Sequence, residues 1–171
     1  MKLGVLASAV LFCAAGPVVW GAESYPSKPI RLVAPFPPGG GTDLLSRIIA
    51  EPASQSFGQT VIVDNRPGAG GAYGAEIVAR SEPDGHTLTL VSASYAATAA
   101  YRKLGFDPVT GIQPIILIGT TGLALTVHPA VPARTTAELI ALGKAQPGKL
   151  NYASVGPGSA VHLALELFKL L

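Results

Sequence analysis

The sequence contains very little of several residue types, and each shortage excludes a class of protein. A single cysteine among 171 residues excludes an internal disulfide framework and a cysteine-rich zinc site. Charged residues make up only 13% of the chain, against about 25% in a typical soluble domain. The 12 basic and 10 acidic side chains form no basic block or basic-aromatic stripe, so nucleic acid is not an expected partner. Apolar residues make up 49%, enough for a sizeable core.

Catalytic and metal-binding patterns are also missing. The three histidines, His86, His128 and His162, are far apart in the sequence and have no cysteine or carboxylate at the spacing of a metal site. No G-x-S-x-G nucleophile turn occurs, and no lysine stands in a phosphate-loop pattern. We therefore expect a protein that is not an enzyme and that holds neither a metal ion nor a cofactor.

The first 22 residues are typical of a secretory signal peptide. Lys2 precedes a stretch from Leu3 to Trp20 that carries no charge, and small residues follow it. Gly4, Gly16 and Pro17 interrupt this stretch, which favours a cleaved signal over a membrane anchor. Cys13 lies inside the signal, so the mature chain would have no cysteine, as suits an oxidising compartment.

Segments that favour strands and helices alternate after the signal. Their order predicts an α/β fold with a mainly parallel sheet. Thr135 with Glu138 forms a capping box at the start of the helix 135–145. The apolar stripe of the last helix runs to Leu171 without a cap, and this uncapped end suggests a truncated chain. The expected strands are 30–36, 60–64, 87–92, 115–118, 123–127 and 151–155, and the expected helices are 43–50, 72–80, 135–145 and 160–171.

The first of three glycine-containing loops reads PFPPGGGTD, from Pro35 to Asp43, between a strand and a helix. We expect Thr42 to be the N-cap and the amides of Gly40, Gly41 and Thr42 to face outward at the helix N-terminus, where the helix dipole favours an anion. Asp43 would repel an anion, so we assign it to holding the loop. The alternative is an ordinary glycine-rich turn.

The second loop, NRPGAGGAYG from Asn65 to Gly74, resembles a dinucleotide-binding fingerprint only loosely. Pro67 stands at the turn, and no acidic residue ends the following strand. We interpret these glycines as allowing close packing of a helix on the sheet. The third loop, YASVGPGSAVH from Tyr152 to His162, again joins a strand to a helix, with Ser159 as the expected N-cap.

Three long stretches of the sequence resemble the Bug family, the extracytoplasmic solute receptors of tripartite tricarboxylate transporters. These stretches are YPSKPIRLVAPFPPGGGTDLLSR (25–47), VIVDNRPGAGGAYGAEIVARSEPDGHTL (61–88) and TTAELIALGKAQPGKLNYASVGPGSAVHLALELFK (135–169). The resemblance implies a type II periplasmic binding-protein fold, in which two α/β lobes with mainly parallel sheets enclose the ligand. Lobe one would occupy residues 23–127, and residues 128–171 would begin a second lobe that is incomplete in this chain.

The resemblance also implies a function. The chain would be a monomeric periplasmic receptor that captures a small organic carboxylate and delivers it to integral membrane subunits. Two alternatives stay open, which are a truncated remnant without activity and an α/β enzyme that binds phosphate or a dinucleotide. Carried over by motif, the ligand-binding residues are Pro38, Gly39, Gly40, Gly41, Thr42, Asp43, Ser92, Ala93, Ser94, Ser154, Gly156, Gly158, Ser159 and His162.

Overall fold

A computed structural model describes residues 24–171 of the chain. The predicted signal peptide, residues 1–22, lies outside the described residues.

A small parallel sheet forms the centre of the larger part of the molecule. Its strands are β1 (Ile30–Ala34), β2 (Val61–Asn65) and β3 (Thr87–Thr89), in the order β2-β1-β3. The central strand β1 is apolar and is almost completely buried, as expected of a parallel strand covered on both faces. The core of the molecule is therefore built around β1.

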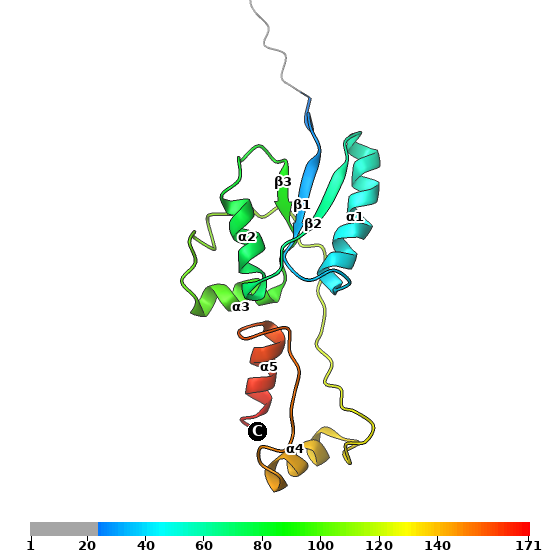
Figure 1. The fold of residues 1–171 in the computed structure, drawn as a ribbon, viewed down its shortest axis with the longest axis vertical. Coiled ribbons are helices and arrows are strands. Elements are labelled where there is room, and N and C mark those ends of the chain that lie inside the picture. The colour runs from blue at the N-terminus through cyan, green and yellow to red at the C-terminus, as the bar shows by residue number, and fades with distance from the viewer. Residues whose placement is uncertain (1–23) are drawn as a thin grey trace, which may run out of the picture.

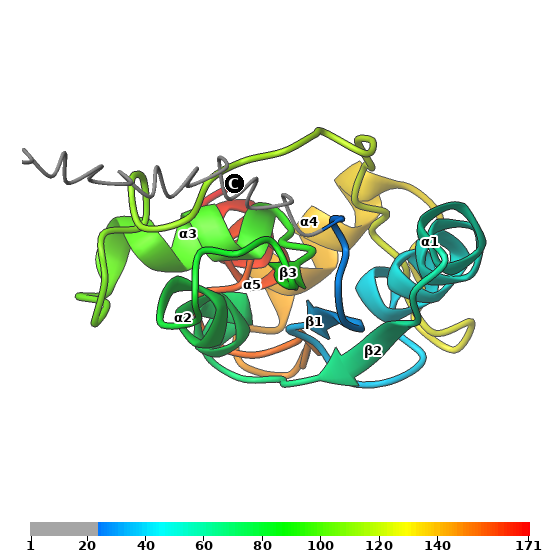
Figure 2. The same ribbon diagram turned by 90° about the horizontal axis from the view of Figure 1, so that it is seen from above.

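Two helices cover the opposite faces of this sheet (Figures 1 and 2). Helix α1 (Gly41–Phe57) packs against β1 and β2, and helix α2 (Ala72–Ala79) packs against β1 and β3. The short 3-10 turn η1 (Ala69–Gly71) leads into α2, and α3 (Ala93–Tyr101) packs against η1 and α2. The α/β alternation predicted for this region is confirmed.

Helix α1 is longer than its predicted range of 43–50. It continues through Pro52 to Phe57 and ends at Gly58, whose φ is 65°. A proline inside a helix removes one backbone hydrogen bond and normally disturbs the turn before it. Ser54 joins this end of the helix to the next strand, because its Oγ donates to the Ala50 carbonyl at 2.6 Å and accepts from the Val61 amide at 2.8 Å. The last turns of α1 are thereby tied to β2.

The C-terminal part consists of two helices that lie away from the sheet (Figure 1). They are α4 (Thr136–Ala145) and α5 (Ala160–Phe168), and neither has a buried residue. The predicted capping box is present, with Glu138 N donating to Thr135 Oγ1 at 3.2 Å and Thr135 N donating to Glu138 Oε2 at 3.2 Å.

Three predicted strands are wrong. Residues 115–118, 123–127 and 151–155 form no strand, and β3 ends at Thr89 rather than at Ser92. The apolar side chains of the first two runs are exposed, with Leu117 78% accessible. A strand needs a neighbouring strand for its backbone hydrogen bonds, and within residues 24–171 these runs have none.

Among the described residues, no helix is both long and apolar enough to cross a membrane. The same residues contain no group of three or more histidine, cysteine, aspartate or glutamate side chains arranged to hold a metal ion.

Candidate functional site

The candidate site lies at one edge of the sheet. Because β1, β2 and β3 are parallel, the loops that follow them all leave from the carboxyl edge. These loops are 35–40, 66–71 and 90–92, and they include the first two glycine loops and the residues before α3. In open α/β sheets, ligands bind in the crevice outside this edge.

Asp43 organises the first loop from inside the first turn of α1. Its carboxylate is buried and accepts hydrogen bonds from the Gly39 amide at 2.8 Å and from Asn65 Nδ2 at 2.9 Å. Arg47, one turn later, forms an ion pair with it at 3.0 Å. Hydrogen bonds from Arg47, the Gly39 amide and Asn65 lower the pKa of Asp43 to about 2. The prediction that Asp43 fixes the loop is confirmed.

The predicted N-cap of this helix is wrong. Helix α1 begins at Gly41, so Gly40 is the N-cap and Thr42 already lies inside the first turn. No side chain caps the helix, because Asp43 bonds back to Gly39 instead. The Gly40 amide, which was expected to face outward, instead donates to the Pro37 carbonyl at 3.3 Å. The first turn therefore still presents backbone amides toward the end of the loop, as the anion-binding hypothesis requires.

The Ser92–Ser94 segment begins helix α3. Ser92 is the N-cap, and its Oγ accepts a hydrogen bond from the Ser94 amide at 3.3 Å. Ser94 is buried, and its Oγ accepts a hydrogen bond from the Ala160 amide at 3.1 Å. This last bond joins two segments that are 66 residues apart in the sequence, and it places the start of α5 against the start of α3.

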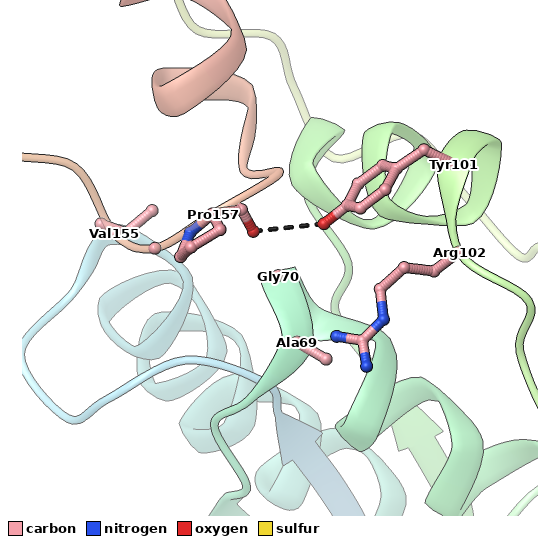
Figure 3. A pocket seen from close by; sticks show the side chains of 7 residues that line it. Ala69, Gly70, Tyr101, Arg102, Val155 and Pro157 are labelled. Carbon is pink, nitrogen blue, oxygen red and sulfur yellow. Dashed lines mark hydrogen bonds between the residues drawn. The ribbon is translucent and has the colours of Figure 1, made fainter.

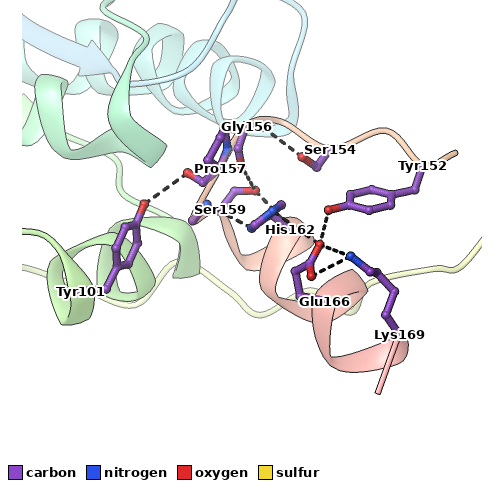
Figure 4. Close-up of polar contacts among 10 residues, drawn as sticks. Tyr101, Tyr152, Ser154, Gly156, Pro157, Ser159, His162, Glu166 and Lys169 are labelled. Carbon is purple, nitrogen blue, oxygen red and sulfur yellow. Dashed lines mark hydrogen bonds and ion pairs between the residues drawn. The ribbon is translucent and has the colours of Figure 1, made fainter. Parts of the chain in front are cut away.

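The third loop is held by hydrogen bonds within itself (Figure 4). Ser159 is buried and is the N-cap of α5, as predicted, with the His162 amide donating to its Oγ at 3.1 Å. The Gly156 amide donates to Ser154 Oγ at 3.3 Å, and the Gly158 amide donates to His162 Nδ1 at 3.2 Å. Each polar residue assigned to this loop from the sequence thus takes part in one local network.

Glu166 lies on α5 beyond this network and contacts three side chains. Tyr152 Oη donates a hydrogen bond to its carboxylate, and Lys169 Nζ lies 2.8 Å from Oε2. His162 Nε2 lies 3.8 Å from Oε1. The hydrogen bonds from Lys169 and Tyr152 lower the pKa of Glu166, so the carboxylate is charged and neutralised by Lys169. This cluster anchors the third loop to the exposed side of α5.

A cavity of about 430 Å³ opens between the second loop, the end of α3 and the third loop (Figure 3). Ala69 and Gly70 line one side, Tyr101 and Arg102 a second side, and residues 155–157 a third. Tyr101 Oη donates to the Pro157 carbonyl at 3.2 Å across the gap. Of the residues assigned from the sequence, only Gly156 lines this cavity.

Sequence reasoning missed Tyr101 and Arg102. Helix α3 was not predicted, because its sequence ASYAATAAY has no apolar stripe. The available signal was Ser92, a favourable N-cap, followed by helix-forming alanines.

The glycines of the second loop allow close packing, as predicted. A Cβ on Gly74 would lie 2.6 Å from Pro35 Cβ, where α2 crosses the end of β1. A Cβ on Gly70, whose φ is 61°, would overlap Thr98 Oγ1 on α3. These contacts explain the glycines without a nucleotide.

Comparisons with known proteins agree with the motifs. The model of the tripartite tricarboxylate transporter family receptor matches residues 45–170. A UPF0065 protein of Bordetella pertussis is 42% identical over 86% of this chain and 46% of its own length. Protein BugT of the same species is 38% identical over 87% of this chain and 47% of its own length.

Solved structures share the fold. R. palustris Rpa4515, solved with adipate, superposes with a TM-score of 0.79 and 37% identity, over 85% of this chain and 49% of that one. MatC of Rhodopseudomonas palustris, solved with malate, gives a TM-score of 0.70 and 30% identity, over 85% of this chain and 51% of that one. The periplasmic binding protein BugD gives a TM-score of 0.69 at 33% identity, over 84% of this chain and 50% of that one.

The predicted α/β periplasmic binding-protein fold is thus confirmed. The chain spans about half the length of the relatives it matches. The family model covers most of the chain, and the two Bordetella proteins match it at 38% and 42% identity. The chain therefore belongs to the tripartite tricarboxylate transporter receptor family, as its three motifs indicate.

Proposed function

We propose that this chain supplies the carboxylate-capturing loops of a periplasmic solute receptor. The ligand would be a small organic acid, held by the first loop (Pro38 to Asp43), by Ser92 to Ser94 and by the third loop. The receptor would be exported by residues 1–22 and would deliver its ligand to the integral membrane subunits of a tripartite tricarboxylate transporter. This function needs neither catalysis nor a cofactor.

The observation that carries the proposal is the hydrogen bond from the Ala160 amide to Ser94 Oγ. It brings the third loop, which belongs to the C-terminal part, against a segment at the carboxyl edge of the sheet. A contact between the Ser92–Ser94 segment and the third loop supports the proposal that both contribute to one ligand site. In two-lobed binding proteins, a ligand that contacts both lobes makes binding and closure a single event.

The chemistry of these loops suits a carboxylate. The first turn of α1 offers backbone amides, and the other segments offer serine hydroxyls. Amides and hydroxyls bind an anion without the cost of burying an unpaired charged side chain. In this structure the Gly156 and Gly158 amides already donate to Ser154 and His162. A ligand that uses these amides must exchange those internal bonds for its own.

Two relatives support this ligand class. One was solved with adipate and another with malate, both small dicarboxylic acids. The competing proposal of a dinucleotide enzyme is less well supported, because close packing accounts for Gly70 and Gly74.

Calorimetry with a panel of mono- and dicarboxylates tests the proposal directly. Gly41→Val is the informative variant, because a Cβ at Gly41 meets nothing within 4 Å, whereas a Cβ at Gly40 would lie 3.3 Å from the Pro37 carbonyl. We expect the added side chain to block the approach of a carboxylate to the first turn of α1 and to weaken binding at least tenfold.

Gly119→Val is the matched control, since Gly119 also has open space around it and belongs to none of the three loops. It should leave the affinity unchanged. If the folded chain binds no carboxylate, or if Gly41→Val binds as tightly as the unmodified chain, then the first loop is not the site.

A further inference from the structure

The cavity between the second loop, α3 and the third loop contains a cation that the proposed carboxylate site does not use. Arg102 follows the last residue of α3, and its amide donates to the Thr98 carbonyl at 2.9 Å, so its backbone is fixed by the helix. Figure 3 shows its side chain folding back from the end of α3 toward Ala69. The guanidinium therefore lies on the wall of the cavity.

Arg102 has no anionic partner within residues 24–171. Other arginines of the described chain, such as Arg31, Arg47 and Arg80, are paired with carboxylates at 2.5–3.0 Å. No carboxylate lies within ion-pair distance of Arg102. A guanidinium presents a planar fork of N–H donors that matches a carboxylate, and here that fork is available.

The second loop adds backbone donors beside this guanidinium. Ala69 and Gly70, whose φ values are 49° and 61°, both line the cavity. Within residues 24–171, neither amide donates to a backbone or side-chain acceptor. The Gly71 amide, by contrast, donates to the Gly68 carbonyl at 3.0 Å.

The third loop borders this cavity on the other side. Tyr101 Oη donates to the Pro157 carbonyl, and the Tyr101 ring occupies the space where a Gly158 side chain would be. The resulting volume of about 430 Å³ lies in the ordinary range of about 300–1,000 Å³ for small-molecule sites. The cavity therefore has room for part of an organic acid.

We propose that this cavity binds the second carboxylate of a dicarboxylate, with Arg102 as the residue that determines this specificity. The inference rests on the proposed function, because the first carboxylate is assigned to the amide-rich loops. Arg102 would form charge-assisted hydrogen bonds to the second carboxylate, and the Ala69 and Gly70 amides would donate to the same group. A monocarboxylate of equal length would leave this cation without a partner.

The test compares matched acids by calorimetry at low ionic strength, using succinate against butyrate and adipate against hexanoate. We expect the unmodified chain to bind the better dicarboxylate at least tenfold more tightly than its monocarboxylate partner. Arg102→Gln should remove most of this preference by weakening the dicarboxylate alone. Arg102→Lys should restore only part of it, because lysine keeps the charge but not the planar fork.

Lys103→Gln is the matched control, because it removes the same charge from the next residue, which does not line the cavity. It should leave the preference intact, and circular dichroism should show that all variants remain folded. A preference that survives Arg102→Gln, or that is lost equally in Lys103→Gln, overturns the inference. Equal binding of both acids overturns this inference alone, whereas binding of no acid overturns the proposed function as well.

Discussion

Replacing Ser94 by alanine should loosen the third loop from the sheet edge. The substitution removes the Oγ that accepts from the Ala160 amide and leaves the rest of α3 unchanged. Ala160 is the first residue of α5, so its amide has no partner within the helix and depends on Ser94. An intramolecular hydrogen bond contributes a net 0.5–1.5 kcal/mol or so. A loss of about 1 kcal/mol corresponds to about a fivefold shift toward the undocked loop.

Amide hydrogen exchange measures this shift at a single site. The Ala160 amide should exchange about fivefold faster in Ser94→Ala. Ser92→Ala provides the control, because Ser92 caps α3 but does not contact Ala160. It should speed exchange at the Ser94 amide and leave Ala160 protected. Unchanged exchange at Ala160 in Ser94→Ala, or an equal increase in Ser92→Ala, would refute the role of this bond in docking the loop.

Three further changes test the packing, the electrostatics and the capping. Gly74→Ala forces a Cβ to within 2.6 Å of Pro35, so urea denaturation should show a loss of about 1–3 kcal/mol in unfolding free energy; an unchanged midpoint would contradict the packing interpretation. The pKa of Asp43 is lowered from 3.8 to about 2 in the folded chain, so its stabilising contribution is complete above about pH 4 and is lost as the pH falls toward 2. Asp43→Asn should flatten the pH dependence of the unfolding free energy between about pH 4 and 2, and an unaltered slope would contradict this. Thr135→Ala should cost α4 about 1 kcal/mol and speed exchange at the Glu138 amide; equal exchange in both chains would show that the capping box is dispensable.

The sequence predicts well the part of the fold in which local pattern and tertiary contacts agree. β1 is an apolar, β-prone run that lies between two other strands, and so its predicted position is confirmed. The caps at Thr135 and Ser159 are confirmed because a capping hydrogen bond involves residues only three apart.

The runs at 115–118 and 123–127 show where local pattern fails. Their β-branched and leucine-rich sequence favours strands, but strand preference depends on packing against neighbouring strands. Within the described residues, no strand pairs with them. A sequence pattern does not state whether such a partner exists.

The candidate site was predicted in part. The role of Asp43 follows from its place in the first turn of a helix, where it meets unpaired amides. Arg102 was missed because a single arginine among loop residues carries no pattern. Only the long-range contacts of α3 with η1 and α5 bring it to the cavity.

The exposed run from Ile115 to Val127 has a consequence for the behaviour of the chain in solution. It contains no charged residue and no proline, which are the residues that usually keep β-prone segments from associating. Its large side chains are in contact with water, and its backbone has no ladder within residues 24–171. We therefore expect this stretch, which lines no part of the cavity, to promote association between copies of the chain. Replacing one of its exposed aliphatic residues with lysine should raise the solubility of the chain and leave the cavity unchanged.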